Sequence, residues 1–142
     1  LDVFPPRNVE ARGQLLPEGK ADPRALDIYR RNVRSLLALA RARGVVPVLA
    51  PQIVNRSRLT ADTRYGWLPF VRDRDVPALV DRYNVVLAEV AAERDVAFLG
   101  ELLQAGWKPE DFLDEGHFSP RGARRFASIV ATALRTRGLV PG

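Results

Sequence analysis

The sequence predicts an α/β fold built on a parallel β-sheet. Twice in succession, an amphipathic helical pattern leads directly into a short apolar run: residues 22–44 into 45–50, and residues 76–94 into 96–100. A helix that crosses over between two buried strands is the usual connection in a parallel sheet. With 142 residues, 46% of them hydrophobic, the chain has the size and composition of one globular unit. We therefore expect residues 1–142 to belong to a single domain.

The first helix carries clear signals at both of its ends. Residues 1–21 are rich in Pro and Gly and show no sustained periodicity, so we expect an irregular N-terminal segment before it. Asp22 is suited to cap the helix, Pro23 to occupy its first turn and Gly44 to end it. Apolar residues at the helical period predict its buried face: Leu26, Tyr29, Val33, Leu36, Leu37 and Ala40.

The next two segments predict strands separated by a loop and a second helix. The run VVPVLA at 45–50 is typical of a strand buried on both faces, and VAFLG at 96–100 predicts a second strand. Residues 51–75 have no clean period and predict a long loop. The helical period returns at 76–94, with apolar positions at Val76, Leu79, Val80, Tyr83, Leu87, Val90 and Ala91.

The last helix is expected to begin after Ser119, as N-cap, with Pro120 in its first turn, and to stop at Gly138. Its predicted buried positions are Ala123, Phe126, Ala127, Val130 and Leu134. Two strands cannot form an independent parallel sheet that is covered on both faces. Further strands must come from residues 1–21 or 51–75, or from a larger domain of which this chain is the second part. The first residue is Leu rather than Met, which favours the larger domain.

Composition excludes several classes of function. The net charge of +5 comes from arginines that are interleaved with acids and accompanied by no nucleic-acid-binding motif, so we expect no nucleic-acid partner. The absence of cysteine excludes disulfides and thiol nucleophiles. One histidine among scattered carboxylates offers no recognisable metal-ligand set, and we expect no metal or cofactor. No apolar run approaches the ~20 residues of a membrane span, and composition leaves the compartment open.

The only histidine, His117, lies in the sequence DEGH, in the loop that follows the second predicted strand. In open α/β sheets, sites form where loops leave the carboxyl ends of strands. In a tight turn, Asp114 can bring its carboxylate within hydrogen-bond reach of the His117 Nδ1 atom, which leaves Nε2 facing outward as a base. Gly116 would give the turn its conformational freedom. The alternative is that Asp114 is an ordinary turn residue and that His117 merely precedes a helix.

The whole pattern D-x-x-H-x-S-x-x-G, with an amphipathic helix behind it and a buried strand before it, resembles the last conserved block of the SGNH (GDSL-type) hydrolases. The stretch DEGHFSPRGARRFASIVATAL carries the resemblance, which extends less specifically over residues 25–137. It implies a three-layer α/β/α, flavodoxin-like parallel sheet, of which this chain is the C-terminal part. It also implies metal-free hydrolysis or transfer of an acyl group from a small-molecule, carbohydrate or lipid ester. Asp114 would orient His117, which would act as base and then as acid.

The sequence departs from that family in its nucleophile. The G-D-S motif, the oxyanion-hole glycine and the G-x-N-D motif do not occur here. Ser35 and Ser128 lie in predicted helices and Ser119 is explained as an N-cap, while Ser57 lies on a loop but lacks the Gly-Asp context. We therefore expect the nucleophile in a missing N-terminal part, upstream or on another chain, and expect this chain alone to be inactive. The alternative is a catalytically inactive SGNH-like binding or assembly module.

Four aromatic side chains lie on the two loops at the expected site: Tyr65, Trp67, Phe70 and Trp107. They are suited to form a wall for an acyl chain or a sugar ring. The alternative is that they anchor the loops to the core of the protein.

Overall fold

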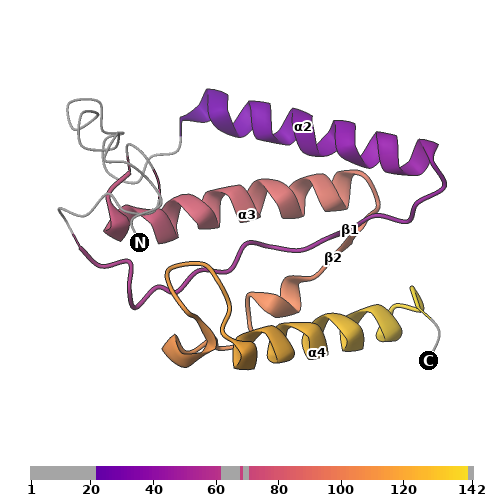
Figure 1. The fold of residues 1–142 in the computed structure, drawn as a ribbon. Coiled ribbons are helices and arrows are strands. Elements are labelled where there is room, and N and C mark those ends of the chain that lie inside the picture. Colours follow the sequence, from indigo (N-terminus) through magenta and orange to yellow (C-terminus); the bar gives the residue numbers. More distant parts are fainter. Residues whose placement is uncertain (1–21, 62–67, 69–70, 141–142) are drawn as a thin grey trace.

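The computed structural model describes residues 22–61, 68 and 71–140, which contain three α-helices and two short strands (Figure 1). In chain order these are α2 (Pro23–Ala42), β1 (Val48–Leu49), α3 (Val76–Glu93), β2 (Ala97–Phe98) and α4 (Pro120–Thr136). Three short 3-10 turns complete the list: η2 (Asp73–Asp75), η3 (Gly100–Leu102) and η4 (Pro109–Asp111). The irregular segment expected at 1–21 lies outside the described residues.

The two strands are parallel neighbours, and α3 forms the connection between them. Their register pairs Val48 with Ala97 and Leu49 with Phe98. This arrangement confirms the predicted α/β class with parallel strands.

Both strands are shorter than the apolar runs predict. Val45 and Val46 were expected inside a buried strand, but they precede β1 and are 56% and 70% exposed. A strand persists only where neighbouring backbone supplies hydrogen bonds, and within the described residues β1 pairs with β2 alone. The prediction of a strand buried on both faces over 45–50 is therefore wrong for its first residues.

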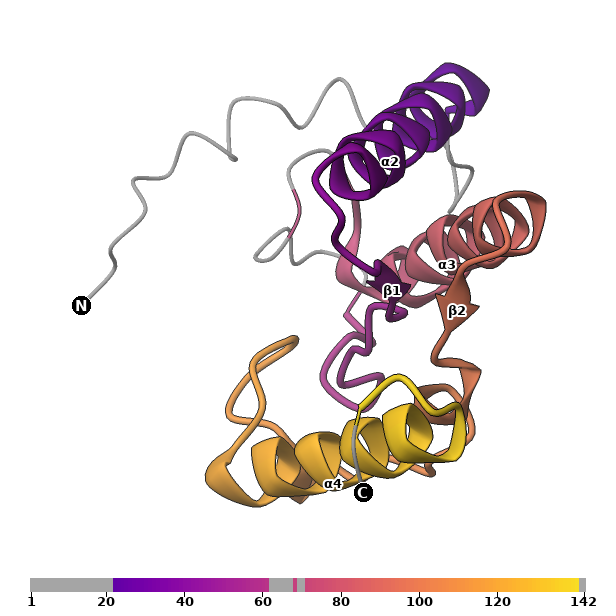
Figure 2. The same cartoon turned by 90° about the vertical axis from the view of Figure 1, so that its right-hand side faces the viewer.

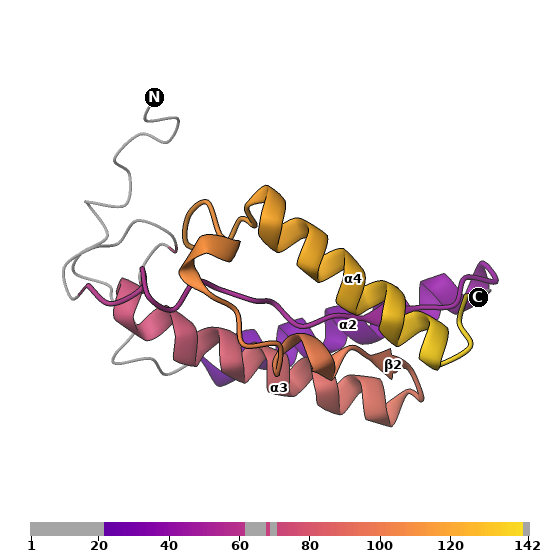
Figure 3. The same cartoon turned by 90° about the horizontal axis from the view of Figure 1, so that it is seen from below.

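Helices lie on both sides of the strand pair. Figures 1 and 2 show α2 and α3 together on one side and α4 on the other. On the first side, Leu49 and Phe98 pack against a buried cluster from α2 and α3: Val33, Leu37, Val86, Leu87 and Val90. On the second side, Val48 packs with Ile53 and with the inner face of α4, which lies across the segment leaving β1 (Figure 3).

The helix ends follow the sequence signals. The Asp22 carboxylate accepts a hydrogen bond from the Arg24 N–H at 2.9 Å, and Gly44 ends α2 with a φ of +68°. The Ser119 hydroxyl accepts from the Gly122 N–H at 3.2 Å, which caps α4 as predicted. These bonds satisfy donors that a helix N-terminus otherwise leaves unpaired.

Some positions on the predicted buried faces are exposed. Leu36 is 66% exposed, because α2 packs on α3 through Val33 and Leu37 and leaves Leu36 on its outer flank. On α4, Ala123 and Ala127 are exposed, and the positions that pack inward are Gly122, Phe126, Ile129, Val130 and Ala133.

Two arginines of α2 form ion pairs with glutamates of α3. Arg30 pairs with Glu89 and Arg34 with Glu93, each at 2.5 Å. These pairs are partly exposed, so solvent screens them and each contributes little to stability.

Candidate active site

The predicted Asp and His lie on a short closed loop, residues 112–118, which we call the acid–base loop. Phe112 and Phe118 form an antiparallel bridge at its base, with their rings stacked 5.2 Å apart. Within the loop, the Leu113 N–H donates to the His117 carbonyl at 2.8 Å. The paired ends hold residues 113–117 as a compact turn next to the N-terminus of α4 (Figure 3).

Asp114 and His117 are in direct contact, as their spacing predicts. Asp114 Oδ2 lies 2.7 Å from His117 Nδ1. The other carboxylate oxygen, Oδ1, accepts from the backbone N–H of Gly116 at 2.9 Å and from that of His117 at 2.7 Å. The carboxylate therefore has a fixed position, and the imidazole has a fixed partner for one of its two nitrogens.

The surroundings of Asp114 keep it ionised at neutral pH. Partial burial raises its pKa, but the backbone N–H groups of Gly116 and His117 and the His117 ring outweigh burial and lower the pKa to about 2. An ionised carboxylate can only accept hydrogen bonds, so Nδ1 of a neutral His117 carries the ring proton. Nε2 is then unprotonated on a side chain that is 78% exposed, as a general base requires.

The depressed pKa of Asp114 makes its contribution to stability dependent on pH. We expect Asp114→Asn to lower the free energy of unfolding by a constant amount at pH values well above 3.8, the ordinary pKa of this group. The deficit should shrink as the pH falls from 3.8 towards 2, because the carboxylate of the unfolded wild-type chain takes up a proton in this range while that of the folded protein stays largely ionised. Urea unfolding of both proteins across this range measures the difference. A deficit that stays constant down to pH 2 would contradict the assigned ionisation of Asp114.

The base of the loop is anchored by Asp111, whose side chain is fully buried. Its carboxylate accepts from the Lys108 N–H at 3.0 Å and pairs with Arg125 at 2.7 Å and Arg121 at 3.1 Å. The hydrogen bond from Lys108 has the largest influence on the pKa of Asp111, which it lowers together with the two arginines against the opposing effect of burial. The Asp111 carbonyl accepts from the Ser119 N–H at 2.9 Å, so one residue ties η4 to the start of α4.

The segment that leaves β1 meets the acid–base loop through Asn55, a residue that the sequence did not single out. Its backbone N–H donates to the Glu115 carbonyl at 2.9 Å, and its side-chain Nδ2 donates to the Asp114 carbonyl at 3.3 Å. The sequence predicted that the loops after the two strands meet at the carboxyl end of the sheet. Nothing in the sequence distinguishes Asn55 from the other polar residues of its loop, because its burial depends on the tertiary fold.

Among the described residues, no serine makes a hydrogen bond to His117. The Ser57 hydroxyl donates to Asn55 Oδ1 at 2.7 Å, and the Ser35 hydroxyl donates to the Arg31 carbonyl within α2. The Ser119 hydroxyl caps α4 and donates to the Glu110 carbonyl, and Ser128 lies on α4 as expected. The structure thus pairs Asp114 with His117 and shows no hydrogen bond from any of these serines to His117.

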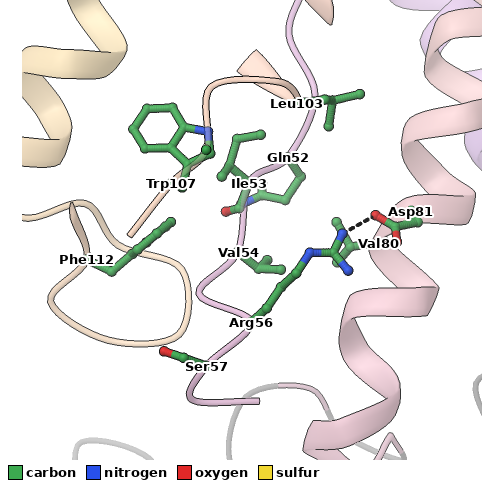
Figure 4. A pocket seen from close by; sticks show the side chains of 11 residues that line it. Gln52, Ile53, Val54, Arg56, Ser57, Val80, Asp81, Leu103, Trp107 and Phe112 are labelled. Atoms are coloured by element: carbon green, nitrogen blue, oxygen red, sulfur yellow. Dashed lines mark hydrogen bonds and ion pairs between the residues drawn. The ribbon is translucent and has the colours of Figure 1, made fainter. Parts of the chain in front are cut away.

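A cavity of about 360 Å³ lies beside the acid–base loop (Figure 4). In Figure 4, Trp107 and Phe112 lie on one side of it, and the ion pair of Arg56 with Asp81 lies on the other. Ser57 is also in its wall. The remaining lining residues are Gln52, Ile53, Val54, Val80, Leu103 and Gly106.

Trp107 packs onto the core, as the second interpretation of the loop aromatics predicts, and it also lines the cavity. Its indole N–H donates to the Leu102 carbonyl at 2.7 Å, and its ring packs against Phe112 and Phe118. It therefore anchors its own loop while forming part of the cavity wall. Tyr65, Trp67 and Phe70 lie outside the described residues.

Searches of the sequence and structure against protein families, curated proteins and solved structures give no match. In the part of the chain that the structure describes, no group of three His, Asp or Glu side chains could hold a metal ion. None of the described helices has the length and apolarity required to cross a membrane.

Proposed function

We propose that this chain is the acid–base part of a serine esterase or acyl hydrolase, with Asp114 orienting His117. The observation that carries the proposal is the contact of 2.7 Å between Asp114 Oδ2 and His117 Nδ1, in which the carboxylate also accepts two backbone N–H groups. The proposed reaction would require no metal or cofactor. Nε2 belongs to a side chain that is 78% exposed, so it can exchange a proton with a bound group.

In the proposed reaction, Nε2 of His117 takes the proton of a serine hydroxyl while the serine oxygen attacks the ester carbonyl carbon. Asp114 stabilises the imidazolium that forms. His117 then gives this proton to the alkoxide oxygen as the ester C–O bond breaks, which leaves an acyl-enzyme and a free alcohol. Water, deprotonated by His117, attacks the acyl carbon, and the proton returns to the serine oxygen as the acid is released.

The serine and the oxyanion donors would come from outside residues 1–142, and the complete domain would be a three-layer, flavodoxin-like α/β/α sandwich. Three features support this proposal: the parallel strands, the helices on both sides of them, and the exposure of Val45 and Val46 beside β1. Additional parallel strands would extend the sheet and bring a nucleophile to its carboxyl edge, where the acid–base loop lies. The cavity beside that loop has room for the acyl group of a substrate.

The isolated chain of 142 residues is expected to form no covalent adduct with a fluorophosphonate probe, which labels activated serines. Ser57 is the one loop serine, and its hydroxyl donates to Asn55 rather than to His117. Intact-mass spectrometry after incubation with the probe measures the adduct, with Ser57→Ala as control. An adduct on the wild type that disappears in both Ser57→Ala and His117→Ala would place the nucleophile within these residues and overturn this part of the proposal.

The alternative function, an inactive binding or assembly module of the same fold, predicts a different result for the larger protein. The absence of a serine at His117 among the described residues is compatible with both functions. A polypeptide that includes the upstream sequence would be labelled by the probe if it is an enzyme. It would remain unlabelled at every serine if it is the inactive module.

A further inference from the structure

We propose that Asn55 is a positioning residue that holds the Asp114–His117 pair in its productive geometry. This inference rests on the proposed function for its chemical meaning. The structural claim is that the buried side chain of Asn55, in the segment after β1, fixes the acid–base loop, which lies in the segment after β2.

The acid–base loop has little apolar packing of its own at its tip. Leu113 is 62% exposed, the Asp114 side chain 41% and the His117 side chain 78%. A loop tip held by few buried contacts opens easily, so its conformation depends on its hydrogen bonds. Asn55 supplies two of these to consecutive carbonyl groups of the loop, those of Asp114 and Glu115.

Asn55 is suited to this role because it is only 3% exposed and because both polar atoms of its side chain form hydrogen bonds. Nδ2 donates to the Asp114 carbonyl, while Oδ1 accepts from the Ser57 hydroxyl at 2.7 Å. The Asp114 carbonyl fixes which way the amide is oriented, since a carbonyl only accepts hydrogen bonds and therefore selects Nδ2, which leaves Oδ1 to the Ser57 hydroxyl. The loop carbonyl would lose this partner if the amide were replaced by a group without a donor.

The segment that carries Asn55 is itself fixed to the core. Asn84, on α3, donates from Nδ2 to the Gln52 carbonyl and accepts from the Gln52 N–H, both at 2.9 Å. Ile53 and Val54, which follow, are both buried. A continuous set of contacts therefore runs from α3 through residues 52–55 to the backbone of Asp114, whose side chain orients His117.

The test compares Asn55→Asp with Val33→Ala in the 15N-labelled full chain. Asn55→Asp keeps the size and the acceptor oxygen of the amide and removes its donor to the Asp114 carbonyl, whereas Val33→Ala weakens the buried cluster between α2 and α3, which does not include the acid–base loop. Asn55→Ala, which has neither the donor nor an added charge, and Ser57→Ala, which leaves Nδ2 in place, are measured beside them. NMR gives the water-exchange rates of the Gly116 and His117 amides, and the Nδ1 proton signal is assigned unambiguously because the chain has a single histidine.

We expect Asn55→Asp and Asn55→Ala to accelerate exchange of the Gly116 and His117 amides about tenfold, the effect of losing one buried hydrogen bond. The His117 Nδ1 proton signal should broaden or vanish in both variants. Val33→Ala and Ser57→Ala should change neither quantity by more than about twofold relative to amides in the middle of α3.

Unchanged exchange and an unchanged Nδ1 signal in the Asn55 variants would overturn the inference. Equal acceleration in Val33→Ala would also overturn it, because the effect would then reflect general destabilisation. The experiment measures amide exchange and the Nδ1 proton signal, and it uses no substrate. A negative result here leaves the proposed ester hydrolysis standing, and failure to detect hydrolysis would leave the structural role of Asn55 standing.

Discussion

His117→Ala is expected to lower kcat/KM for ester hydrolysis by about 1,000-fold or more in the protein that contains both this chain and the nucleophile. The variant removes the group that takes and returns the serine proton, and no other histidine is present in these residues to replace it. Stability should change little, because the His117 side chain is 78% exposed. Hydrolysis of p-nitrophenyl acetate and thermal unfolding measure the two quantities.

Two further variants control this prediction. Leu113→Ala changes an exposed side chain of the same loop and should leave kcat/KM within about twofold of the wild type. Asp114→Asn keeps the shape of the acid but removes its charge, and it should reduce kcat about as severely as His117→Ala. Retention of most of the hydrolytic rate in His117→Ala would show that this histidine is not the base.

Gly122→Ala should lower the free energy of unfolding by about 3 kcal/mol or more, near the upper end of overpacking effects. A Cβ atom at this position would lie 1.9 Å from the Asp111 carbonyl oxygen and 3.0 Å from the Phe118 ring. The nearest neighbour is buried backbone that also accepts the Ser119 N–H, so it cannot move without disturbing the start of α4. Helix propensity alone would favour alanine by about 1 kcal/mol, so the sign of the effect is diagnostic. Urea unfolding measures the difference.

The matched control is Gly100→Ala. There the added Cβ atom would meet the Phe98 ring at 3.6 Å, an ordinary van der Waals distance, and we expect a change below about 1 kcal/mol. If Gly122→Ala were as stable as the wild type, α4 would not pack against Asp111 as closely as described.

The comparison of the two glycines also explains part of the sequence pattern. Gly122 is the glycine of the D-x-x-H-x-S-x-x-G pattern, and from the sequence its role was unknown. The structure gives the reason for it: α4 approaches the base of the acid–base loop too closely for any side chain. The glycine therefore allows α4 and the base of the loop to lie in contact.

Local signals in the sequence predicted helices better than strands. The caps at Asp22 and Ser119 and the terminal glycines depend on neighbouring residues alone, and the structure confirms them. Strand length depends on the pairing partner, so apolar runs located β1 and β2 correctly but overestimated their extent. Leu36 shows the same limit for side chains, because its exposure is decided by where α3 lies.

In the candidate site, too, contacts between neighbouring residues could be predicted from the sequence and long-range contacts could not. Contact between Asp114 and His117 follows from a spacing of three residues in a turn, and the structure has it. Their catalytic role stays a prediction. Asn55 is 59 residues from Asp114 in the sequence, and only the parallel arrangement of β1 and β2 brings the two together. A contact of this kind has no local signature in the sequence.

The most direct test of the central claim is the rate of fluorophosphonate labelling in the polypeptide that includes the sequence upstream of residue 1, with the labelled serine located by peptide mapping. We expect a labelled serine outside residues 1–142, and a loss of labelling of about 100-fold or more when His117 is replaced by alanine. Labelling that is equally fast without His117, or an adduct located on Ser57, would contradict the assignment of Asp114 and His117 as the acid–base pair of an upstream nucleophile.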